Sequence, residues 1–345
     1  MFQTKLKLVF LMVKKSNNVL ITQSPNRDGI GRYVSELGFR LKVDISYTNN
    51  ILSPMNFFRI YFGYKIVHFP HFIVPLFKLP GQKFVTTIQD ITPLLHKDLN
   101  LLKRSYLFVR IFFSLLRSDH VIFTSNYVSN KCREIFKIKY TSSIIPLGVD
   151  YNFFAKRRAP IYENGKYFLI VGRRRSNKNT INMAIAFAKA RIDTSIKLIF
   201  VGKKRKTDKE LLNIIERFGI VNRVLFTENL TDDALAAMYQ HATGLLFVSR
   251  FEGFGLPVLE AMASGCPVIT STSTSLPEVA GVDAFFANPD DVGQIKTAIE
   301  TCATEGISEE RRKSAMQRAL EFSWERTSKE TSVVYKNLYS FSKTE

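Results

Sequence analysis

The sequence has few cysteines and no stretch that is apolar enough to cross a membrane. Its three cysteines, Cys132, Cys266 and Cys302, lie far apart, which excludes a disulfide framework and any metal site built on a Cys-x-x-Cys pair. No uncharged apolar run reaches the roughly 18 residues that a membrane-spanning helix needs. The six apolar residues of Leu8–Val13 fall short of the roughly 7–15 found in a signal sequence. We therefore expect a cytoplasmic protein.

Acidic residues are also scarce relative to basic ones. The 345-residue chain carries 49 Lys and Arg against 30 Asp and Glu, which gives a formal charge of +19. The excess is uneven, because residues 1–150 carry 21 basic and 8 acidic side chains, whereas residues 151–345 carry 28 and 22. The first half should therefore meet an anionic partner, and nucleic acid, phosphorylated ligands and a lipid headgroup surface all remain open.

Short apolar segments alternate with amphipathic helical patterns along the chain, which is typical of parallel α/β sheets. We expect two Rossmann-like domains, 1–155 and 166–322, and a C-terminal helix over 323–345 that packs back toward the first domain. Ligands of such sheets bind beyond the carboxyl ends of the strands, so the site is expected in the cleft between the domains. The predicted strands are Val19–Thr22, Ile66–Phe69, Phe84–Ile88, His120–Thr124, Tyr167–Val171, Lys197–Val201, Arg223–Phe226, Gly244–Val248 and Pro267–Thr270.

The most informative segment is Ser249–Gly265, SRFEGFGLPVLEAMASG, which follows a predicted strand. Gly253 and Gly255 allow a tight turn and a close approach of the backbone to a ligand. Pro257 suits the first turn of a helix, whose unbonded N–H groups form an anion site. The alternative is a plain glycine turn, with two nearby acids that interact favourably with the helix dipole.

Those acids carry a family resemblance. Glu252 and Glu260, within FEGFGLPVLEAMASGCPVI, closely resemble the Glu-x7-Glu motif of glycosyltransferase family 4, and SLPE at 275–278 is also similar. GIGRY and IPLGVD in the first half are weaker matches. The resemblance implies a retaining, nucleotide-sugar-dependent glycosyltransferase of GT-B fold, most similar to mannosyltransferase-type members.

The resemblance also implies a donor site. Glu260 would bind the nucleotide ribose and Glu252 the donor sugar, and because both face cations and a helix N-terminus, both are expected to stay ionised. A basic loop, Gly172–Asn179, follows another predicted strand, where cations suit a pyrophosphate. Taken alone it fits a solvated loop or a nucleic-acid patch equally well. The family comparison makes Arg173 and Lys178 the diphosphate ligands, and adds to the donor site Gly253, Phe254, Gly255 and Leu256.

Two loops of the first half complete the expected site. Gly29 and Gly31 belong to a loop that closes over the donor in the family, although alone they indicate only a turn. Gln89 stands where the family usually has histidine. Glutamine cannot exchange a proton near neutral pH, so we expect Gln89 and Asp90 to position acceptor or donor sugar. Asp90 as a helix or turn cap is the alternative.

The basic first half contains an apolar helical segment, Asn100–Ser118, in which Lys103, Arg110 and Arg117 recur every seven residues. A drift of only about 20° per heptad places these cations in one stripe. Such a helix, together with the aromatic segment Met55–Tyr64, could lie on an anionic membrane. A core helix with one solvated basic edge is the alternative.

The sequence thus predicts a glycosyltransferase that moves a hexose, with mannose from GDP-mannose favoured, to a glycan or lipid-linked acceptor in polysaccharide or lipopolysaccharide-type biosynthesis. We expect no metal, because the sequence has no Asp-x-Asp beside a strand. We expect no nucleic acid as partner, and a cytoplasmic location, peripheral on the inner face of the membrane. A basic nucleic-acid-binding protein and a non-catalytic sugar-nucleotide-binding protein are the two alternatives.

Overall fold

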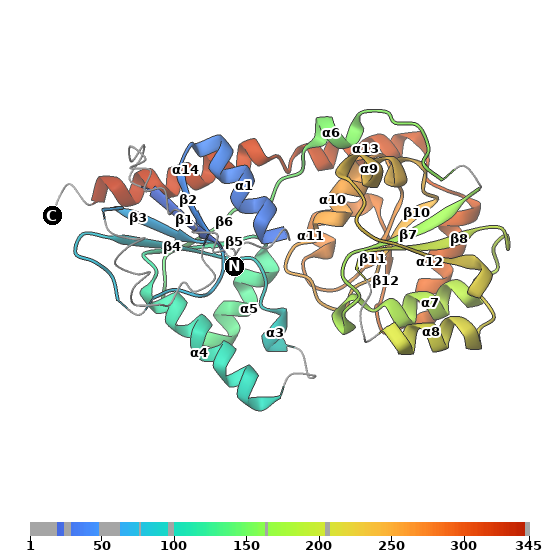
Figure 1. Ribbon diagram of the computed structural model, residues 1–345, viewed down its shortest axis with the longest axis horizontal. Coiled ribbons are helices and arrows are strands. Elements are labelled where there is room, and N and C mark those ends of the chain that lie inside the picture. The colour runs from blue at the N-terminus through green and yellow to red at the C-terminus, as the bar shows by residue number, and fades with distance from the viewer. Residues whose placement is uncertain are drawn as a thin grey trace, which may run out of the picture.

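Two parallel six-stranded sheets, each covered by helices, lie side by side in the computed structural model (Figure 1). The structure describes residues 19–23, 29–47, 63–75, 77–95, 100–162, 165–203 and 208–341. We call the first sheet with its helices the N-terminal unit, and the second sheet with its helices the C-terminal unit. This arrangement confirms the predicted α/β fold with two Rossmann-like sheets.

The first sheet has the order β2-β1-β3-β4-β5-β6, and every pair is parallel. Its strands are β1 (Val19–Gln23), β2 (Asp44–Tyr47), β3 (Ile66–Phe69), β4 (Lys83–Ile88), β5 (His120–Phe123) and β6 (Ser142–Ile144). Its helices are α1 (Gly29–Leu41), α3 (Thr92–Leu95), α4 (Leu101–Arg117), α5 (Asn126–Phe136) and α6 (Tyr151–Ala155).

The second sheet has the order β12-β11-β10-β7-β8-β9 and is also parallel throughout. Its strands are β7 (Tyr167–Val171), β8 (Lys197–Val201), β9 (Val224–Thr227), β10 (Gly244–Phe247), β11 (Val268–Ser271) and β12 (Phe285–Ala287). Its helices are α7 (Thr180–Lys189), α8 (Asp208–Arg217), α9 (Asp232–His241), α10 (Leu256–Ala263), α11 (Leu276–Ala280), α12 (Val292–Thr304) and α13 (Glu309–Leu320), and a 3-10 turn, η1, spans Ser176–Lys178.

The last helix, α14 (Trp324–Phe341), returns to the N-terminal unit and packs on α1, as Figure 1 shows. The two chain segments that join the units run side by side, because the Val149 N–H donates to the Phe322 carbonyl at 2.8 Å. A Cβ on Gly148 would lie 2.2 Å from the Trp324 nitrogen, so only glycine allows this approach. The predicted C-terminal helix that crosses back is therefore present.

The strands that line the centre of each sheet explain why the fold forms. In β3, β7 and β10 every residue is buried, because helices cover both faces of the sheet. Parallel strands end at the same edge of a sheet, so the loops after β1, β4 and β5 gather at one edge, and those after β7, β10 and β11 gather at another. Contacts between these two sets of loops form what we call the junction.

Candidate active site

The loop between β10 and α10 contacts the N-terminal unit at the junction. Gly255 is the N-cap of α10 with φ at 118°, a left-handed conformation that favours glycine, and Pro257 lies in the first turn. Among the described residues no side chain caps this end of the helix. Pro257 has no N–H and the Val258 N–H donates to the Gly255 carbonyl at 2.9 Å, so the N–H groups of Gly255 and Leu256 are the ones that could meet an anion. The predicted turn and helix are both present, with α10 one residue earlier than expected.

Gly253 touches the N-terminal unit directly. A Cβ there would lie 1.9 Å from the Gln89 carbonyl oxygen, so no other residue fits. Ser125 lies at the start of α5, and its hydroxyl donates a 2.8 Å hydrogen bond to the Gly253 carbonyl. The loops after β4 and β5 thus pack against the loop after β10, and bring Gln89 and Asp90 next to the predicted donor site.

Lys178 and Glu252 form the central ion pair of the site. Their Nζ and Oε1 atoms are 2.6 Å apart, and the Lys178 ammonium lies 4.9 Å from the ring centre of Phe247. The neighbouring Asn179 adopts φ of 58° and donates from its side chain to the carbonyls of Val248 and Pro289. These bonds hold the loop after β7 against the loop after β10, which fixes the position of Lys178.

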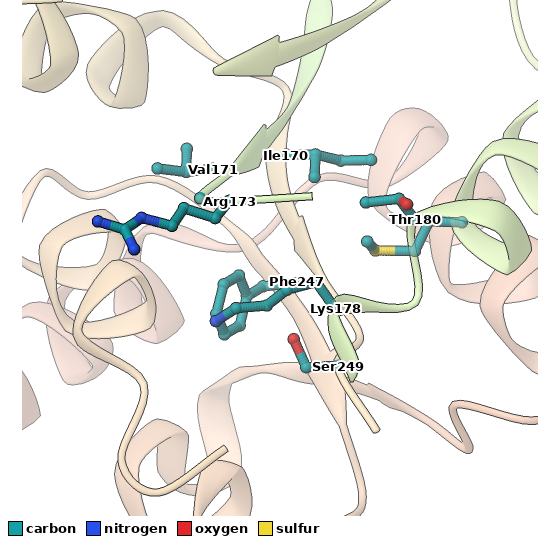
Figure 2. Close-up of a pocket in the computed structure, with 9 residues that line it drawn as sticks. Ile170, Val171, Arg173, Lys178, Thr180, Phe247 and Ser249 are labelled. Atoms are coloured by element: carbon teal, nitrogen blue, oxygen red, sulfur yellow. The ribbon is translucent and has the colours of Figure 1, made fainter. Parts of the chain in front are cut away.

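Arg173 lies beside Lys178. Both line a pocket at the carboxyl ends of β7 and β10, with Ile170, Val171, Gly172, Thr180, Met183, Phe247 and Ser249 (Figure 2). The guanidinium of Arg173 and the ammonium of Lys178 point toward the same side of this pocket in the figure. Within the described part of the chain, the Arg173 side chain has no hydrogen-bond or ion-pair partner. The pocket therefore presents one paired and one unpaired cation.

The next arginine in the sequence, Arg174, has a structural role. Arg174 is buried, and its Nε lies 2.9 Å from the Asp208 carboxylate at the start of α8. It also donates to the Gly202 carbonyl at 2.9 Å and lies over the Phe226 ring. This side chain holds β8 and α8 together and turns away from the pocket.

Asp90 acts as a cap. Its carboxylate accepts from the Thr92 backbone N–H at 2.6 Å and from the Thr92 hydroxyl, at the start of α3. Burial raises the pKa of Asp90, while these bonds and Lys178 partly oppose the rise and Glu252 adds to it. The alternative capping role is thus observed, beside a continuing electrostatic contact with the ion pair. The side-chain nitrogen of Gln89 is buried without a hydrogen-bond partner in the described structure.

Glu260 lies on α10 and meets the N-terminal unit through a residue that sequence reasoning did not single out. Its Oε1 is 3.3 Å from Nη1 of Arg32 on α1, and its Oε2 accepts from the Tyr239 hydroxyl at 3.2 Å. Burial raises the pKa of Glu260 to about 7; Arg32 and Tyr239 oppose that rise, whereas Asp232 adds to it. The raised pKa argues against the expectation that this acid stays ionised near neutral pH, because desolvation outweighs the nearby cation.

The remaining predicted donor residues take different places. Gly29 and Gly31 lie in the first turn of α1 and not in a loop before it, and a Cβ on Gly29 would lie 3.8 Å from Leu256. Phe254 is buried, with its ring 6.0 Å from that of Phe322, so only its backbone could face a donor. Arg173 and Lys178 share the pocket, whereas Glu260 lies outside its lining, at the contact between α10 and α1.

Glu278 forms the second contact of the junction that the sequence did not reveal. Its carboxylate accepts from the backbone N–H groups of Asn126 and Tyr127, and from the Asn126 side chain, each at 3.0 Å. It therefore caps α5 of the N-terminal unit from α11 of the C-terminal unit.

Metal ligation finds little support in the described ranges. They contain no group of three or more His, Cys, Asp or Glu side chains placed to hold an ion. His68, one of the two histidines near a strand end, is buried between the Tyr335 and Thr87 hydroxyls at 2.6 and 2.7 Å, in a packing role. The three cysteines are all buried and free, as predicted.

Comparisons with known proteins agree with this geometry. Residues 152–319 match the family described as glycosyl transferases group 1. O-antigen chain mannosyltransferase B of Escherichia coli is 32% identical over 50% of this chain and 46% of its own length. O-antigen chain mannosyltransferase RfbU of Salmonella typhimurium is 30% identical over 68% of this chain and 64% of its own. The chain thus matches less than two thirds of the length of each of these curated relatives.

Solved structures share the whole architecture. Sucrose-phosphate synthase from Thermosynechococcus elongatus superimposes with a TM-score of 0.77 at 17% identity, over 93% of this chain and 99% of that one. Anabaena HepE in complex with UDP and glucose gives a TM-score of 0.77 at 16% identity, over 92% and 99%. The fold is therefore the GT-B fold that the sequence predicted.

Proposed function

The chain belongs to the glycosyl transferases group 1 family, and from this premise we propose that it is a retaining glycosyltransferase. The donor is a nucleotide-sugar, with GDP-mannose favoured, and the acceptor is a glycan or a lipid-linked glycan of polysaccharide or lipopolysaccharide-type biosynthesis. Two matched relatives are O-antigen mannosyltransferases, which supports mannose, whereas a structural neighbour was solved with UDP and glucose. The protein works in the cytoplasm, at the inner face of the membrane.

One observation carries the proposal: Lys178, paired with Glu252, shares a pocket with Arg173, which has no partner among the described residues, and Glu252 lies in the loop that leads into the N-terminus of α10. In glycosyl transfer, the bond between sugar C1 and the diphosphate breaks, and negative charge grows on the leaving phosphates. Arg173, Lys178 and the first N–H groups of α10 would stabilise that charge, and each well-aimed donor contributes about 2.7–4 kcal/mol to lowering the barrier. This site therefore favours a diphosphate as leaving group.

The carboxylates of Glu252 and Glu260 accept hydrogen bonds from hydroxyl groups of the donor. When the phosphates bind Lys178, Glu252 is released from its ion pair and accepts from a sugar hydroxyl, while Glu260 accepts from the ribose. The acceptor hydroxyl bonds to C1 on the face that the diphosphate leaves, and its proton ends on the released diphosphate. Gln89 and Asp90 position the sugars from the N-terminal unit, because glutamine holds no exchangeable proton near neutral pH.

The test is transfer of labelled sugar from a panel of UDP-, GDP- and ADP-sugars to isolated lipid-linked glycans, preceded by a thermal-shift screen of the same donors. We expect one donor to raise the unfolding temperature and to be consumed. Glu252→Ala should abolish consumption with the fold intact, whereas Glu305→Ala, on an exposed turn after α12, should leave consumption unchanged. Undiminished turnover in Glu252→Ala would remove the proposed role.

Two other functions remain distinguishable in the same experiment. A donor that binds without any consumption would favour a non-catalytic sugar-nucleotide-binding protein, for which Gln89 in place of histidine is the motivating feature. Steeply salt-dependent binding to nucleic acid, without affinity for any nucleotide-sugar, would favour a nucleic-acid-binding protein, for which the charge of +19 is the motivating feature.

A further inference from the structure

Helix α4 exposes an apolar face that none of the described residues covers. Five residues spaced by three and four positions lie on it: Leu102, Tyr106, Val109, Phe113 and Leu116. Leu102 is 82% exposed, Tyr106 57% and Leu116 51%. Phe77, which is 74% exposed, lies near the C-terminal end of α4, because the adjacent Lys78 pairs with Asp119 at 2.5 Å.

This face is not the one that holds the helix to the protein. Ile111 and Leu115 are the buried apolar residues of α4, and they pack in a cluster with Val121 of β5 and Phe136 of α5. The helix is therefore anchored without the exposed side chains. A contiguous apolar surface of this kind on a soluble unit marks an interaction site. Figure 1 shows α4 at the outer side of the N-terminal unit, away from the junction.

The charged residues of α4 itself are all positive. Helix α4 contains no acidic residue, and Lys103 and Arg104 are exposed at its N-terminal end. Exposed Lys137 follows Phe136, whose ring lies 4.9 Å from that of Phe108 on α4. The predicted basic stripe is only partly correct, since Arg110 and Arg117 are half-buried and Arg110 lies over the Tyr106 ring.

We propose that this face of α4 binds the surface of an anionic lipid bilayer, with the helix lying in the headgroup plane. Apolar side chains flanked by lysine and arginine, with no acid among them, suit acyl chains beneath anionic headgroups. Seventeen residues make a helix about 25 Å long, and no described helix is long and apolar enough to span a membrane. The geometry therefore fits a helix on the surface.

The charge of α4 also argues against two other partners for this face, a second copy of the chain and nucleic acid. Two copies of the chain paired through α4 would bring two sets of four cations together with no acid on either helix. Nucleic acid would satisfy the cations but leave the apolar residues in water. The proposal extends the proposed function by placing the acceptor on a membrane, and it rests on that function only for the identity of the acceptor.

Vesicle sedimentation of the full chain tests it, with phosphatidylcholine vesicles that contain or lack about 30% phosphatidylglycerol. We expect binding only to the anionic vesicles. The double variant Leu102→Ser/Leu116→Ser should weaken it by about tenfold or more, because both side chains would otherwise leave water. Lys103→Gln/Arg104→Gln should weaken it by about fivefold for each charge. Val282→Ser, at an 89% exposed valine of the C-terminal unit, is the matched control and should bind as the wild type does.

Two results would overturn the proposal: equal binding by the wild type and both double variants, or no vesicle binding together with a dimer whose formation requires Leu102 and Leu116. Donor consumption without membranes is measured on the same variants and should be unchanged, since α4 lies outside the active site. Loss of vesicle binding with normal donor consumption separates this proposal from the proposed function.

Discussion

Replacing Arg32 by methionine tests how the N-terminal unit controls the donor site. Arg32 extends from α1 and places Nη1 3.3 Å from Oε1 of Glu260, while Tyr239 holds the other carboxylate oxygen. Methionine keeps much of the volume and removes the charge. We expect the variant to fold, and to bind nucleotide-sugar with an altered dependence on pH.

The magnitude follows from the geometry. Two unit charges 3.3 Å apart attract by about 5 kcal/mol at an effective dielectric constant of about 20. The Arg32 side chain is 26% exposed, so solvent screening reduces the net effect to about 1–2 kcal/mol. Each 1.4 kcal/mol or so moves a pKa by about one pH unit. Burial already raises the pKa of Glu260 to about 7, and the loss of Arg32 should raise it further.

The sign for stability follows from proton binding. Between the ordinary value of 4.5 and about 7, folded Glu260 holds a proton that the unfolded chain has released. Its contribution to stability therefore falls as pH rises through this window and is constant above it. In Arg32→Met the fall should continue above pH 7. Donor affinity should rise with pH over the same range, because ribose hydroxyls donate to the ionised carboxylate. The variant should therefore need a higher pH than the wild type to bind the donor.

The assay is calorimetric titration of GDP-mannose or UDP-glucose from about pH 6 to about pH 9, paired with thermal unfolding at each pH. Arg40→Met is the control, since Arg40 lies on the same helix and pairs with Glu36 and Glu325 instead. At about pH 7.5 we expect roughly two- to eightfold weaker binding in Arg32→Met, because the ionised fraction of Glu260 falls by that factor, and little change in Arg40→Met. Identical pH profiles for wild type and Arg32→Met would refute the reasoning.

Three further substitutions have clear expected outcomes. Gly253→Ala should lower transfer by more than about tenfold in a rate assay and reduce the unfolding temperature, because its Cβ would overlap the Gln89 carbonyl; a normal rate would contradict the packing. Arg174→Met removes the buried cation that pairs with Asp208, and urea unfolding should show a loss of about 3–5 kcal/mol, whereas under 1 kcal/mol would argue against the pair. Glu278→Ala removes the acceptor of the first two N–H groups of α5 while the Ser125 cap remains, and should cost about 1–2 kcal/mol by thermal unfolding; an unchanged midpoint would show that this contact is dispensable.

The strands at the centre of each sheet were readable from the sequence, as was the edge strand β9, whereas the other three edge strands were not. Strands buried on both faces, such as β3, β7 and β10, are continuous apolar runs. The missed strands, β2, β6 and β12, all lie at the edges of their sheets and are three or four residues long. A short edge strand buries little, so it needs no apolar run to form.

Local motifs predicted the loop after β10 well, because its conformation depends on glycine and proline. Long-range pairings had no such signal. Arg32 and Glu260 are 228 positions apart, and nothing in either segment indicates the other. The directions of the two neighbouring arginine side chains could not be predicted either. Arg173 lines the pocket, whereas Arg174 pairs with Asp208. A loop has no periodicity from which the direction of a side chain could be inferred.

The start of α1 shows a related limit. Glycine is disfavoured inside helices, so the sequence indicated a turn at Gly29 and Gly31. The structure begins the helix at Gly29, which lies next to Leu256 across the junction. Gly29 contacts Leu256 only when the two units are packed together. Local helix propensities do not include such a contact, so they could not predict the start of α1.

The account depends most on a donor diphosphate bound beside Arg173 and Lys178 at the start of α10. Calorimetric titration of the preferred nucleotide-sugar into the wild type and Arg173→Met tests this most directly, with Arg191→Met, beyond the far end of α7, as control. Because the Arg173 side chain has no partner in the described structure, we expect affinity to fall by about tenfold or more with no change in unfolding temperature. Equal affinity in Arg173→Met and the wild type would contradict the account.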